Sequence, residues 1–414
     1  MTNRKRIFVW TLFDFANTSF AIVVTTFLYA IYFTETVAKG DKNADLYWSI
    51  STSAAMFITA FLAPVMGAIA DYSKGKKKFL LFFTLLCIIN TGLLYFVGEG
   101  NIAAGMILFI LANIGFEAGL IFYDAFLPEI TSPRNYGRVS GYGYAMGYLG
   151  SLSTLAVVFP FINNNLIKET FPLSALFFLI FALPIFLFLK EKRADLEDRR
   201  KSYISIGMER VGYTLSHLKN YKNLSFFLLS YFLFIEGVNT VIYFAGIFAK
   251  KTLGFSMTEL IIFFLTVQST AIIGSILFGI LSDSIGQKKS LVFTLLIWIF
   301  TIGFAYFVNT KELFYVVGLL AGVSMGSSQS ISRSLMTKLT PEEKKTEFFG
   351  FYSFFGKSSA IIGPLLFGVI SSTTGNQRYA ILSVLFFFIS GLLVLLKVND
   401  SPEKTEAVTE NAGS

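Results

Sequence analysis

Long apolar runs separated by short polar breaks follow one another along the chain from residue 7 to residue 397. A helix needs roughly 20 apolar residues to cross a bilayer. Twelve runs come close to or exceed that length: residues 7–33, 47–70, 79–97, 102–126, 138–159, 171–189, 224–249, 257–281, 290–308, 313–336, 347–371 and 378–397. Because lipid leaves backbone groups no hydrogen-bond partner outside their own segment, we expect these runs to be helical. The pattern predicts an all-α membrane protein with twelve transmembrane helices.

The composition agrees with a membrane protein and argues against several kinds of site. Of the 414 residues, 54% are hydrophobic and 14% are charged, whereas soluble domains are about 25% charged, so a soluble enzyme is excluded. The single cysteine, Cys87, lies inside the third run, and the single histidine, His217, lies in a polar loop. They exclude a disulfide framework and argue against a zinc site or a Cys–His nucleophile. We expect no cofactor and no resident metal.

The basic residues are distributed unevenly between the two sides of the membrane. With an even number of spans both termini lie on one side, and the segments on that side hold 25 of the 34 Lys and Arg residues. The positive-inside rule places both termini and the long central loop in the cytoplasm. The net charge of +8 therefore reflects topology rather than nucleic-acid binding. We expect a monomeric multi-pass protein of a prokaryotic cell (inner) membrane, with a small solute and the lipid bilayer as partners and protons as a candidate partner.

The longest polar stretch, Lys190–Asn223, divides the chain into two sets of six spans. The predicted units are an N-terminal six-helix bundle at 1–189, a cytoplasmic linker at 190–223, a C-terminal six-helix bundle at 224–397 and a disordered cytoplasmic tail at 398–414. Within the linker, apolar residues recur at helical spacing: Ile204, Met208, Val211, Leu215 and Leu218. This face predicts an amphipathic helix on the cytoplasmic membrane surface.

The two halves of the chain carry the same short motif after the second and the eighth span. In each copy a Gly-x-x-x-Asp pair is followed by another glycine and two lysines. The first copy consists of Gly67, Asp71, Gly75, Lys76 and Lys77. The second copy consists of Gly279, Asp283, Gly286, Lys288 and Lys289. Glycines in the fifth and eleventh spans correspond in the same way, Gly141 and Gly147 to Gly350 and Gly356. Internal repeats of this kind are typical of transporters.

The repeated motif predicts a gating latch. Small residues let helices approach closely in a bilayer, and an aspartate at the membrane edge can pair with lysines or accept backbone hydrogen bonds. Such contacts would hold the cytoplasmic ends of the halves together in one conformation and release them in another. We expect Arg333 to reach Asp283 and Glu347 and form the latch of the second half. The predicted latch residues are Gly67, Asp71, Gly279, Asp283, Gly286, Lys288, Lys289, Arg333 and Glu347.

These motifs resemble the loop pattern G-x-L-x-D-x-x-G-x-K-K of the major facilitator superfamily. Residues 279–289 carry the pattern completely, whereas the first copy has Ile69 in place of Leu and one extra residue between Asp71 and Gly75. The resemblance implies two pseudo-symmetric six-helix bundles that transport a small solute by alternating access.

Further motifs resemble the vacuolar-effluxer-like branch of this superfamily, which is related to the fungal autophagy vacuolar effluxer. They are Leu12-Phe-Asp14-Phe-Ala-Asn17-Thr-Ser-Phe20, Phe122-Tyr-Asp124-Ala-Phe-Leu-Pro128, Glu236-Gly-Val-Asn239, Gln329-Ser-Ile-Ser-Arg333, Glu347-Phe-Phe-Gly350 and Gly356-Lys357. Family members often have Asp at the position of Glu236 and Asn at that of Asp124. The resemblance implies small-solute transport, and amino acid efflux from vacuoles is the role attached to the fungal members.

Two ionisable residues are the sharpest candidates for the transport site. A charge at mid-helix costs about 2.5–3.5 kcal/mol on insertion scales, so its presence needs a reason. Glu236 and Lys357 lie near the midplane of the seventh and eleventh spans, the depth at which alternating-access carriers hold substrate. The alternative is a static ion pair that locks the C-terminal half.

Three further acids are candidates for ion coupling. Asp14 shares a helix face with Asn17; it is a candidate for proton uptake and release, or for pairing with a lysine at the cytoplasmic rim. Glu117 and Asp124 lie two turns apart on one side of the fourth span, where they can relay a proton or attract a cation. Alternatively, Asp124 pairs with Arg138. Neutral hydrogen-bonding groups complete the set of substrate or ion-coupling candidates: Asn239, Gln268 and Gln329.

A secondary carrier is the favoured class of function. The chain has no Gly-x-x-x-x-Gly-Lys-Ser/Thr motif for ATP hydrolysis. A channel and an acidic protease built on Asp14 and Asp124 are the least favoured alternatives, because the flanks of these acids do not support a protease and two related halves argue for a carrier. The alternative is a facilitative uniporter or an exporter of another solute, such as a sugar, a drug or a lipid-like molecule. Midplane charges of both signs favour a zwitterion such as an amino acid or small peptide, because a singly charged solute would leave one protein charge uncompensated.

Overall fold

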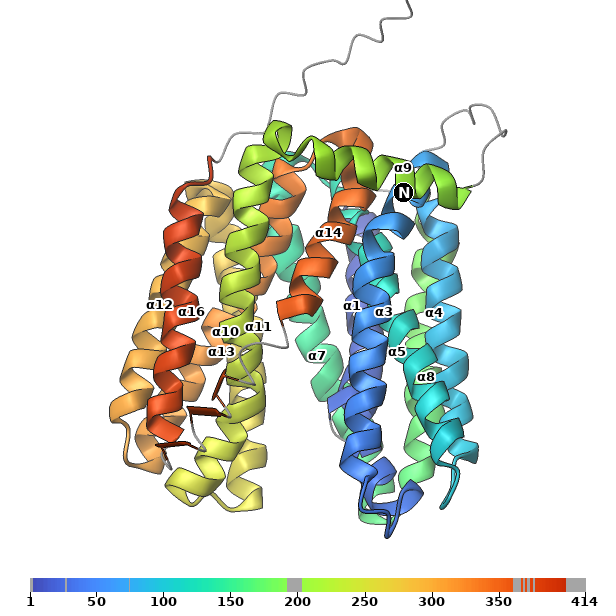
Figure 1. Cartoon of the computed structure of the whole chain (residues 1–414), viewed down its shortest axis with the longest axis vertical. Helices are drawn as coiled ribbons and strands as arrows, with labels where there is room; N and C mark the ends of the chain where they lie inside the picture. The colour runs from blue at the N-terminus through green and yellow to red at the C-terminus, as the bar shows by residue number, and fades with distance from the viewer. Residues whose placement is uncertain are drawn as a thin grey trace, which may run out of the picture.

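The computed structural model describes residues 3–26, 28–73, 75–191, 203–359, 366–367, 369–370, 373–374 and 377–399, and these residues are mostly helical (Figure 1). No residue in these ranges lies in a β-strand. The all-α prediction is therefore confirmed. Most of the charged run that opens the predicted linker, and the predicted tail beyond residue 399, lie outside the described residues.

The first half begins with a helix that changes its winding as it crosses the membrane. Helix α1 (Asn3–Phe20) continues through a π-helical turn (Ala21–Thr26), α2 (Leu28–Tyr32) and a second π-helical turn (Phe33–Val37). The other helices of this half are α3 (Ala44–Ser73), α4 (Lys76–Leu93), α5 (Ile102–Asp124), the short α6 (Leu127–Ile130), α7 (Tyr136–Asn163) and α8 (Ile167–Phe188).

The second half repeats the order of the long helices. Its elements are α10 (Lys222–Leu253), α11 (Met257–Ile285), α12 (Gln287–Phe307), α13 (Lys311–Leu339), α14 (Lys345–Ser358) and α16 (Gln377–Leu396). Within the described part of the chain, eleven helical segments are long and apolar enough to cross a membrane. The predicted run at 347–371 is the one that is not among them, because only its first part, in α14, is described continuously.

The helices bury aromatic side chains between them and present apolar side chains outward. Trp10 stacks on Tyr123 with ring centroids 4.6 Å apart, and Trp298 stacks on Phe388 at 4.9 Å. Large side chains on the outer surface are also apolar; Phe300, for example, is 63% exposed. Such a surface suits lipid, in which an apolar side chain needs no cover by protein.

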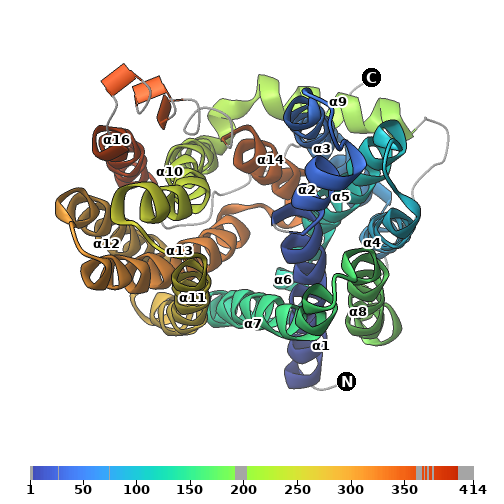
Figure 2. The same cartoon turned by 90° about the horizontal axis from the view of Figure 1, so that it is seen from below.

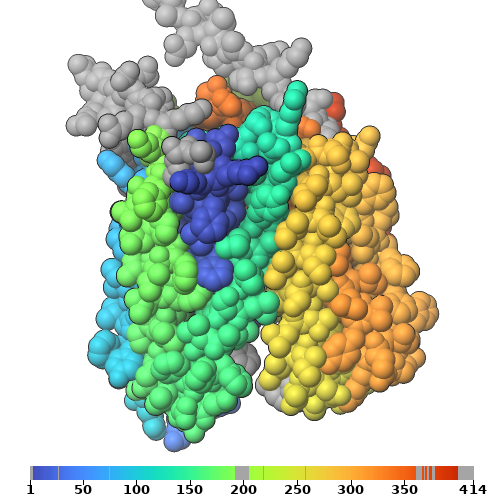
Figure 3. All heavy atoms as spheres, turned by 180° about the vertical axis from the view of Figure 1, so that it is seen from behind, coloured from blue at the N-terminus to red at the C-terminus, as the bar shows by residue number. Residues whose placement is uncertain are grey.

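The two halves lie side by side and meet along two helix pairs (Figure 2). Helix α3 of the first half packs against α14 of the second, and α7 packs against α11. Figure 3 shows α7 in green against α11 in yellow, in contact toward the end of the molecule that carries α9 (Tyr203–Ser216) and separated toward the other end. We call the end that carries α9 and the loops after α3 and α11 the closed end, and we call the opposite end the open end.

Helix α9 lies across the closed end (Figure 1). A Cβ on its Gly207 would lie 2.8 Å from the side chain of Ile69 on α3, and its Thr214 is fully buried. Met208 and Leu215, from the predicted apolar face, are 58% and 50% exposed. The helix therefore rests on protein with one face and leaves an apolar stripe uncovered, as expected for a helix at a membrane surface. The side chains of Ile204 and Leu218 lie outside the described residues.

Candidate functional site

An aspartate of the first half holds a helix of the second half at the closed end. Asp71, near the end of α3, accepts hydrogen bonds from the backbone N–H groups of Thr346 (3.1 Å) and Glu347 (2.8 Å), in the first turn of α14. The first N–H groups of a helix have no partner within the helix and carry the positive end of its dipole. The Asp71 carboxylate therefore satisfies both the hydrogen bonds and the charge of this helix end.

An aspartate of the second half makes the equivalent contact with a helix of the first half. Asp283, near the end of α11, accepts hydrogen bonds from the backbone N–H groups of Gly137 (2.8 Å) and Arg138 (3.1 Å), in the first turn of α7. The Arg138 side chain adds an ion pair through Nε at 2.7 Å. Asp71 and Asp283 occupy equivalent places in the internal repeat, so the repeat has produced two related contacts between the halves.

Glycines bring the paired helices close enough for these contacts. A Cβ on Gly67 would overlap the backbone oxygen of Thr346, and a Cβ on Gly141 would overlap that of Ser275. The repeat-related Gly350 and Gly279 are enclosed in the same way by the backbone of the facing helix. Helices of opposite halves therefore touch backbone to backbone, which only small residues permit.

The remaining motif residues of the second loop shape its turn. Gly286 has a φ of +96°, a conformation that side-chain-bearing residues rarely adopt. Lys288 Nζ donates to the backbone oxygen of Leu396 at 2.9 Å, within its own half, and Lys289 is exposed. Neither lysine pairs with Asp283 among the described residues.

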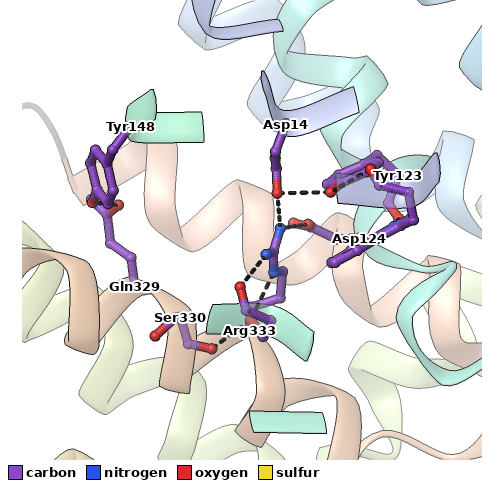
Figure 4. Close-up of polar contacts among 9 residues, drawn as sticks. Asp14, Tyr123, Asp124, Tyr148, Gln329, Ser330 and Arg333 are labelled. Atoms are coloured by element: carbon purple, nitrogen blue, oxygen red, sulfur yellow. Dashed lines mark hydrogen bonds and ion pairs between the residues drawn. The ribbon is translucent and has the colours of Figure 1, made fainter. Parts of the chain in front are cut away.

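Nearer the membrane centre, Arg333 of α13 joins the two halves through a buried cluster (Figure 4). Its Nη1 contacts Asp14 Oδ2 at 3.1 Å and Asp124 Oδ1 at 3.0 Å. Its Nε donates to Ser140 Oγ at 2.9 Å, and Nη2 donates to the Ser140 backbone oxygen at 2.8 Å. Asp14 also accepts a hydrogen bond from the Tyr123 hydroxyl at 2.7 Å. One guanidinium of the second half thus holds α1, α5 and α7 of the first.

Aromatic rings enclose the guanidinium. Arg333 Cζ lies 4.3 Å from the ring centroid of Tyr144, 4.7 Å from that of Trp10 and 5.7 Å from that of Tyr123. Such rings attract a cation through their quadrupole, and the attraction is stronger where water is excluded. The Arg333 side chain is only 2% exposed, so the rings and carboxylates replace its water shell.

This geometry corrects the expected partners of Arg333 and differs from the alternative partners considered for Asp14 and Asp124. Arg333 does not reach Asp283 or Glu347, because its side chain points into the first half instead of along its own half to the rim. Asp14 pairs with Arg333 rather than with a lysine at the cytoplasmic rim. Asp124 also pairs with Arg333 and not with Arg138, because the Arg138 Nε contacts Asp283.

Glu347 belongs to a separate network beneath α9. Thr214 of α9 donates to Glu347 Oε1 at 2.5 Å, and Lys344 Nζ donates to Thr214 Oγ1 at 2.9 Å. Arg210 Nε lies 4.0 Å from Glu347 Oε2. The Glu347 side chain is fully buried, and α9 supplies a hydrogen bond to its Oε1 and a positive charge beside its Oε2. Helix α9 therefore contacts both α3 and α14 at the seam between the halves.

A second charged contact joins the halves deeper in the membrane. Lys357 Nζ of α14 lies 2.5 Å from Glu117 Oε2 of α5. The Lys357 side chain is 26% exposed and that of Glu117 is 6% exposed. The contact observed for Lys357 is therefore with the opposite half, whereas the alternative left by the sequence was a static pair with Glu236 within the second half.

The other candidates are distributed over both halves. Glu236 is fully buried on α10, and Asn239 Nδ2 donates to Ser359 Oγ at 3.3 Å within the second half. Gln329 accepts a hydrogen bond from the Tyr148 hydroxyl of the first half at 2.9 Å (Figure 4). Asn17 is buried on α1, and Gln268 is half-buried on α11. The Tyr148–Gln329 hydrogen bond therefore adds a further contact between the halves.

Tyr123, Ser140 and Thr214 are among the network residues that the sequence interpretation missed. Tyr123 directly precedes Asp124 in one of the recognised motifs, so the sequence did indicate that it lies close to the cluster. Ser140 and Thr214 had no such signal, because a serine or threonine in a span or amphipathic helix usually bonds to its own helix backbone. Their roles depend on the partner helix that tertiary packing brings to them.

No group of three or more metal-ligating side chains gathers in the part of the chain that the structure describes. Two helical halves joined at one end, with charged pairs between them, are the arrangement found in carrier folds. Solved structures share this fold: the proton:xylose symporter XylE has a TM-score of 0.75 at 14% identity over 97% of each chain. The human organic anion transporter MFSD10 has a TM-score of 0.78 at 16% identity, covering 95% of this chain and 100% of that one. The fold is that of the major facilitator superfamily.

The family model described as "Vacuole effluxer Atg22 like" matches residues 35–408. The chain belongs to this family of major facilitator transporters. It is similar to the "Uncharacterized MFS-type transporter YxiO" of Bacillus subtilis, with 31% identity over 411 residues that cover 96% of this chain and 94% of that one. It is also similar to "Autophagy-related protein 22" of Kluyveromyces lactis, with 26% identity over 89% of this chain and 82% of that one.

Proposed function

We propose that this chain is a secondary carrier that moves a small zwitterionic solute, an amino acid or small peptide, by alternating access between its two halves. The family description names vacuole effluxers, and similarity to such proteins supports solute transport. One observation carries the class of solute. The Lys357–Glu117 pair joins the halves at 2.5 Å, and the Lys357 side chain remains 26% exposed.

The charge balance of this pair favours a solute with both charges. Removing one partner of a buried pair leaves an uncompensated charge, which is strongly unfavourable. A zwitterion inserted between the two side chains would place its carboxylate against Lys357 and its ammonium group against Glu117, so neither charge loses its partner. Glu236, which is fully buried on α10, adds a second carboxylate on the side of the second half. A solute that contacts both halves can also shift the equilibrium between their two relative positions, because its contacts differ between those positions.

We further infer that protons couple to transport. The Arg333 cluster and the Lys357 pair together contain three carboxylates, Asp14, Asp124 and Glu117, against two basic groups. An excess of buried acid is costly unless protons offset it. Acids inside a bilayer are also the usual elements of proton relays in transporters.

The orientation and organisation follow from the distribution of charge along the chain. We propose that the closed end faces the cytoplasm of a prokaryotic cell, because the basic loop segments gather there. The carrier would then stand open to the outside in this conformation. The proposed units are a bundle at 1–189, a cytoplasmic linker at 190–223 and a bundle at 224–397, acting as a monomer.

Counterflow in proteoliposomes tests the proposal. Vesicles loaded with an unlabelled amino acid should accumulate the labelled amino acid transiently, and amino acid methyl esters or N-acetylated forms should support at least about tenfold less exchange, because each lacks one charge of the zwitterion. Lys251→Ala, at an exposed position of α10 that has no assigned role, should retain the wild-type pattern of exchange. Counterflow that ignores both modifications, or that occurs only with sugars or hydrophobic cations, would contradict the zwitterion proposal.

A further inference from the structure

The Arg333 cluster contains more acid than base. One guanidinium lies within 3.1 Å of two carboxylates, and the side chains of Arg333, Asp14 and Asp124 are 2%, 11% and 14% exposed. With both carboxylates ionised, the cluster carries one uncompensated negative charge. An unpaired buried charge is heavily penalised. Binding one proton makes the cluster neutral, whereas binding two would leave the arginine uncompensated.

The two carboxylates differ in their hydrogen bonds. Asp14 Oδ2 accepts from both Tyr123 Oη (2.7 Å) and Arg333 Nη1 (3.1 Å). Among the described residues, Asp124 accepts only from Arg333 Nη1, at 3.0 Å. Hydrogen bonds to the ionised form stabilise that form. A single proton is therefore better placed on Asp124 than on Asp14.

The cation and the acids of the cluster belong to different halves (Figure 4). Arg333 lies on α13, whereas Asp14 lies on α1 and Asp124 on α5. Opening of the closed end must draw Arg333 away from both acids and leave two neighbouring carboxylates without their cation. Uptake of a proton offsets part of that cost. The open arrangement therefore binds the proton more tightly than the closed arrangement does.

We propose that Asp14, Asp124 and Arg333 form a binding site for one proton, carried on Asp124, whose occupation favours opening of the closed end. The inference rests on the proposed alternating-access cycle, for which it names the coupling site. By thermodynamic linkage, because opening raises the affinity of the site for the proton, binding of the proton favours opening to the same extent. One proton changes the ratio of open to closed molecules by at most about tenfold per pH unit.

Other groups around the cluster do not supply the missing charge. The rings of Trp10, Tyr123 and Tyr144 and the hydroxyl of Ser140 face Arg333 and are neutral. Tyr231 of α10 and Lys357 of α14 interact electrostatically with Asp124. Lys357 already has its own carboxylate in Glu117, so the positive charge available to the cluster remains that of Arg333.

Distance measurements between the halves test this site without any solute. Spin labels at Lys78→Cys on α4 and Lys289→Cys on α12, in a Cys87→Ser background, occupy exposed positions at the closed end of opposite halves. Double electron–electron resonance on the full-length protein in nanodiscs should show longer distances at about pH 5 than at about pH 8, with a rise of at least about tenfold in the open-to-closed ratio. Asp124→Asn should reduce this pH response to less than about twofold, and Asp124→Glu should restore it.

Several outcomes would overturn the proposal. One is a wild-type distance distribution that does not change with pH, and another is an Asp124→Asn variant that responds like the wild type. Loss of the response in Glu117→Gln but not in Asp124→Asn would assign the proton to the Lys357 site. A response to sodium at constant pH, in place of a response to pH, would make the ligand a metal cation. Absence of amino acid counterflow alongside the expected pH response would refute the proposed solute and leave the proton site standing.

Discussion

Lys357 Nζ on α14 lies 2.5 Å from Glu117 Oε2 on α5, so the two halves of this transporter are joined inside the membrane by an ion pair. A pair of opposite charges between moving parts differs from apolar packing in one respect. It can be broken at low cost only when another pair of charges replaces it, because a lone charge in lipid is strongly unfavourable. The contact therefore restricts which solutes can pass between the halves.

The first prediction concerns this pair. Glu117→Gln and Lys357→Ala should each reduce amino acid counterflow by at least about tenfold, which corresponds to about 1.4 kcal/mol, because each leaves a charge at the site without a partner. Glu236→Ala should reduce counterflow as strongly, since it removes an acidic side chain that is fully buried on α10. Membrane insertion, checked by fluorescence size-exclusion chromatography, should be unchanged. Wild-type transport rates in all three variants would show that the solute does not use these charges.

The second prediction concerns the two aspartates of the closed end. Asp71→Asn and Asp283→Asn should each favour opening there, because a hydrogen bond to a charged group contributes about 1.5–3 kcal/mol and each carboxylate accepts two from backbone N–H groups. The spin-label pair on α4 and α12 should report at least about a tenfold rise in the open population. Unchanged distances together with weaker solute binding would contradict a latch role. Ser284→Ala, at a neighbouring exposed position, is the control.

The third prediction concerns backbone contact between the halves. Gly67→Ala should destabilise the closed arrangement and slow transport, because the new methyl group would overlap the backbone oxygen of Thr346 on α14 and backbone atoms cannot turn aside. Gly303→Ala on α12 is a matched control, since nothing lies within 4 Å of the added methyl. Thermal stability and counterflow should fall in the first variant and stay at wild-type values in the second. Equal behaviour of the two variants would mean that α3 and α14 need not approach this closely.

The fourth prediction concerns the helix between the halves. Thr214→Val keeps the shape of the side chain but removes its hydrogen bonds to Glu347 and Lys344. A buried carboxylate that loses a partner is destabilised by about 1–3 kcal/mol or more, so α9 should detach from the closed end more often. Hydrogen exchange of α9 should become faster by about tenfold, with Ser216→Ala, whose side chain is exposed, as the control. Unaltered exchange would show that α9 is held by its apolar contacts with α3.

The sequence by itself determined the fold of this protein. Lipid imposes a strict condition on any segment that crosses it, because every backbone hydrogen bond must be made within the segment, and the length and polarity of each run therefore predict a helix directly. The internal repeat was equally visible, since Asp71 and Asp283 retain the same local spacing to their glycines. From that repeat followed the superfamily and the expected place of contact between the halves.

Only the tertiary structure decided which charges meet. Depth in the membrane can be counted along a helix, and this brought Lys357 and Glu236 to a common level. The direction in which a side chain points across the interface depends on the rotation and tilt of its helix, which packing against neighbouring helices sets. Arg333 shows the consequence: its position near the rim suggested Asp283 and Glu347 as partners, whereas the packing of α13 against α7 directs it to Asp14 and Asp124 in the other half.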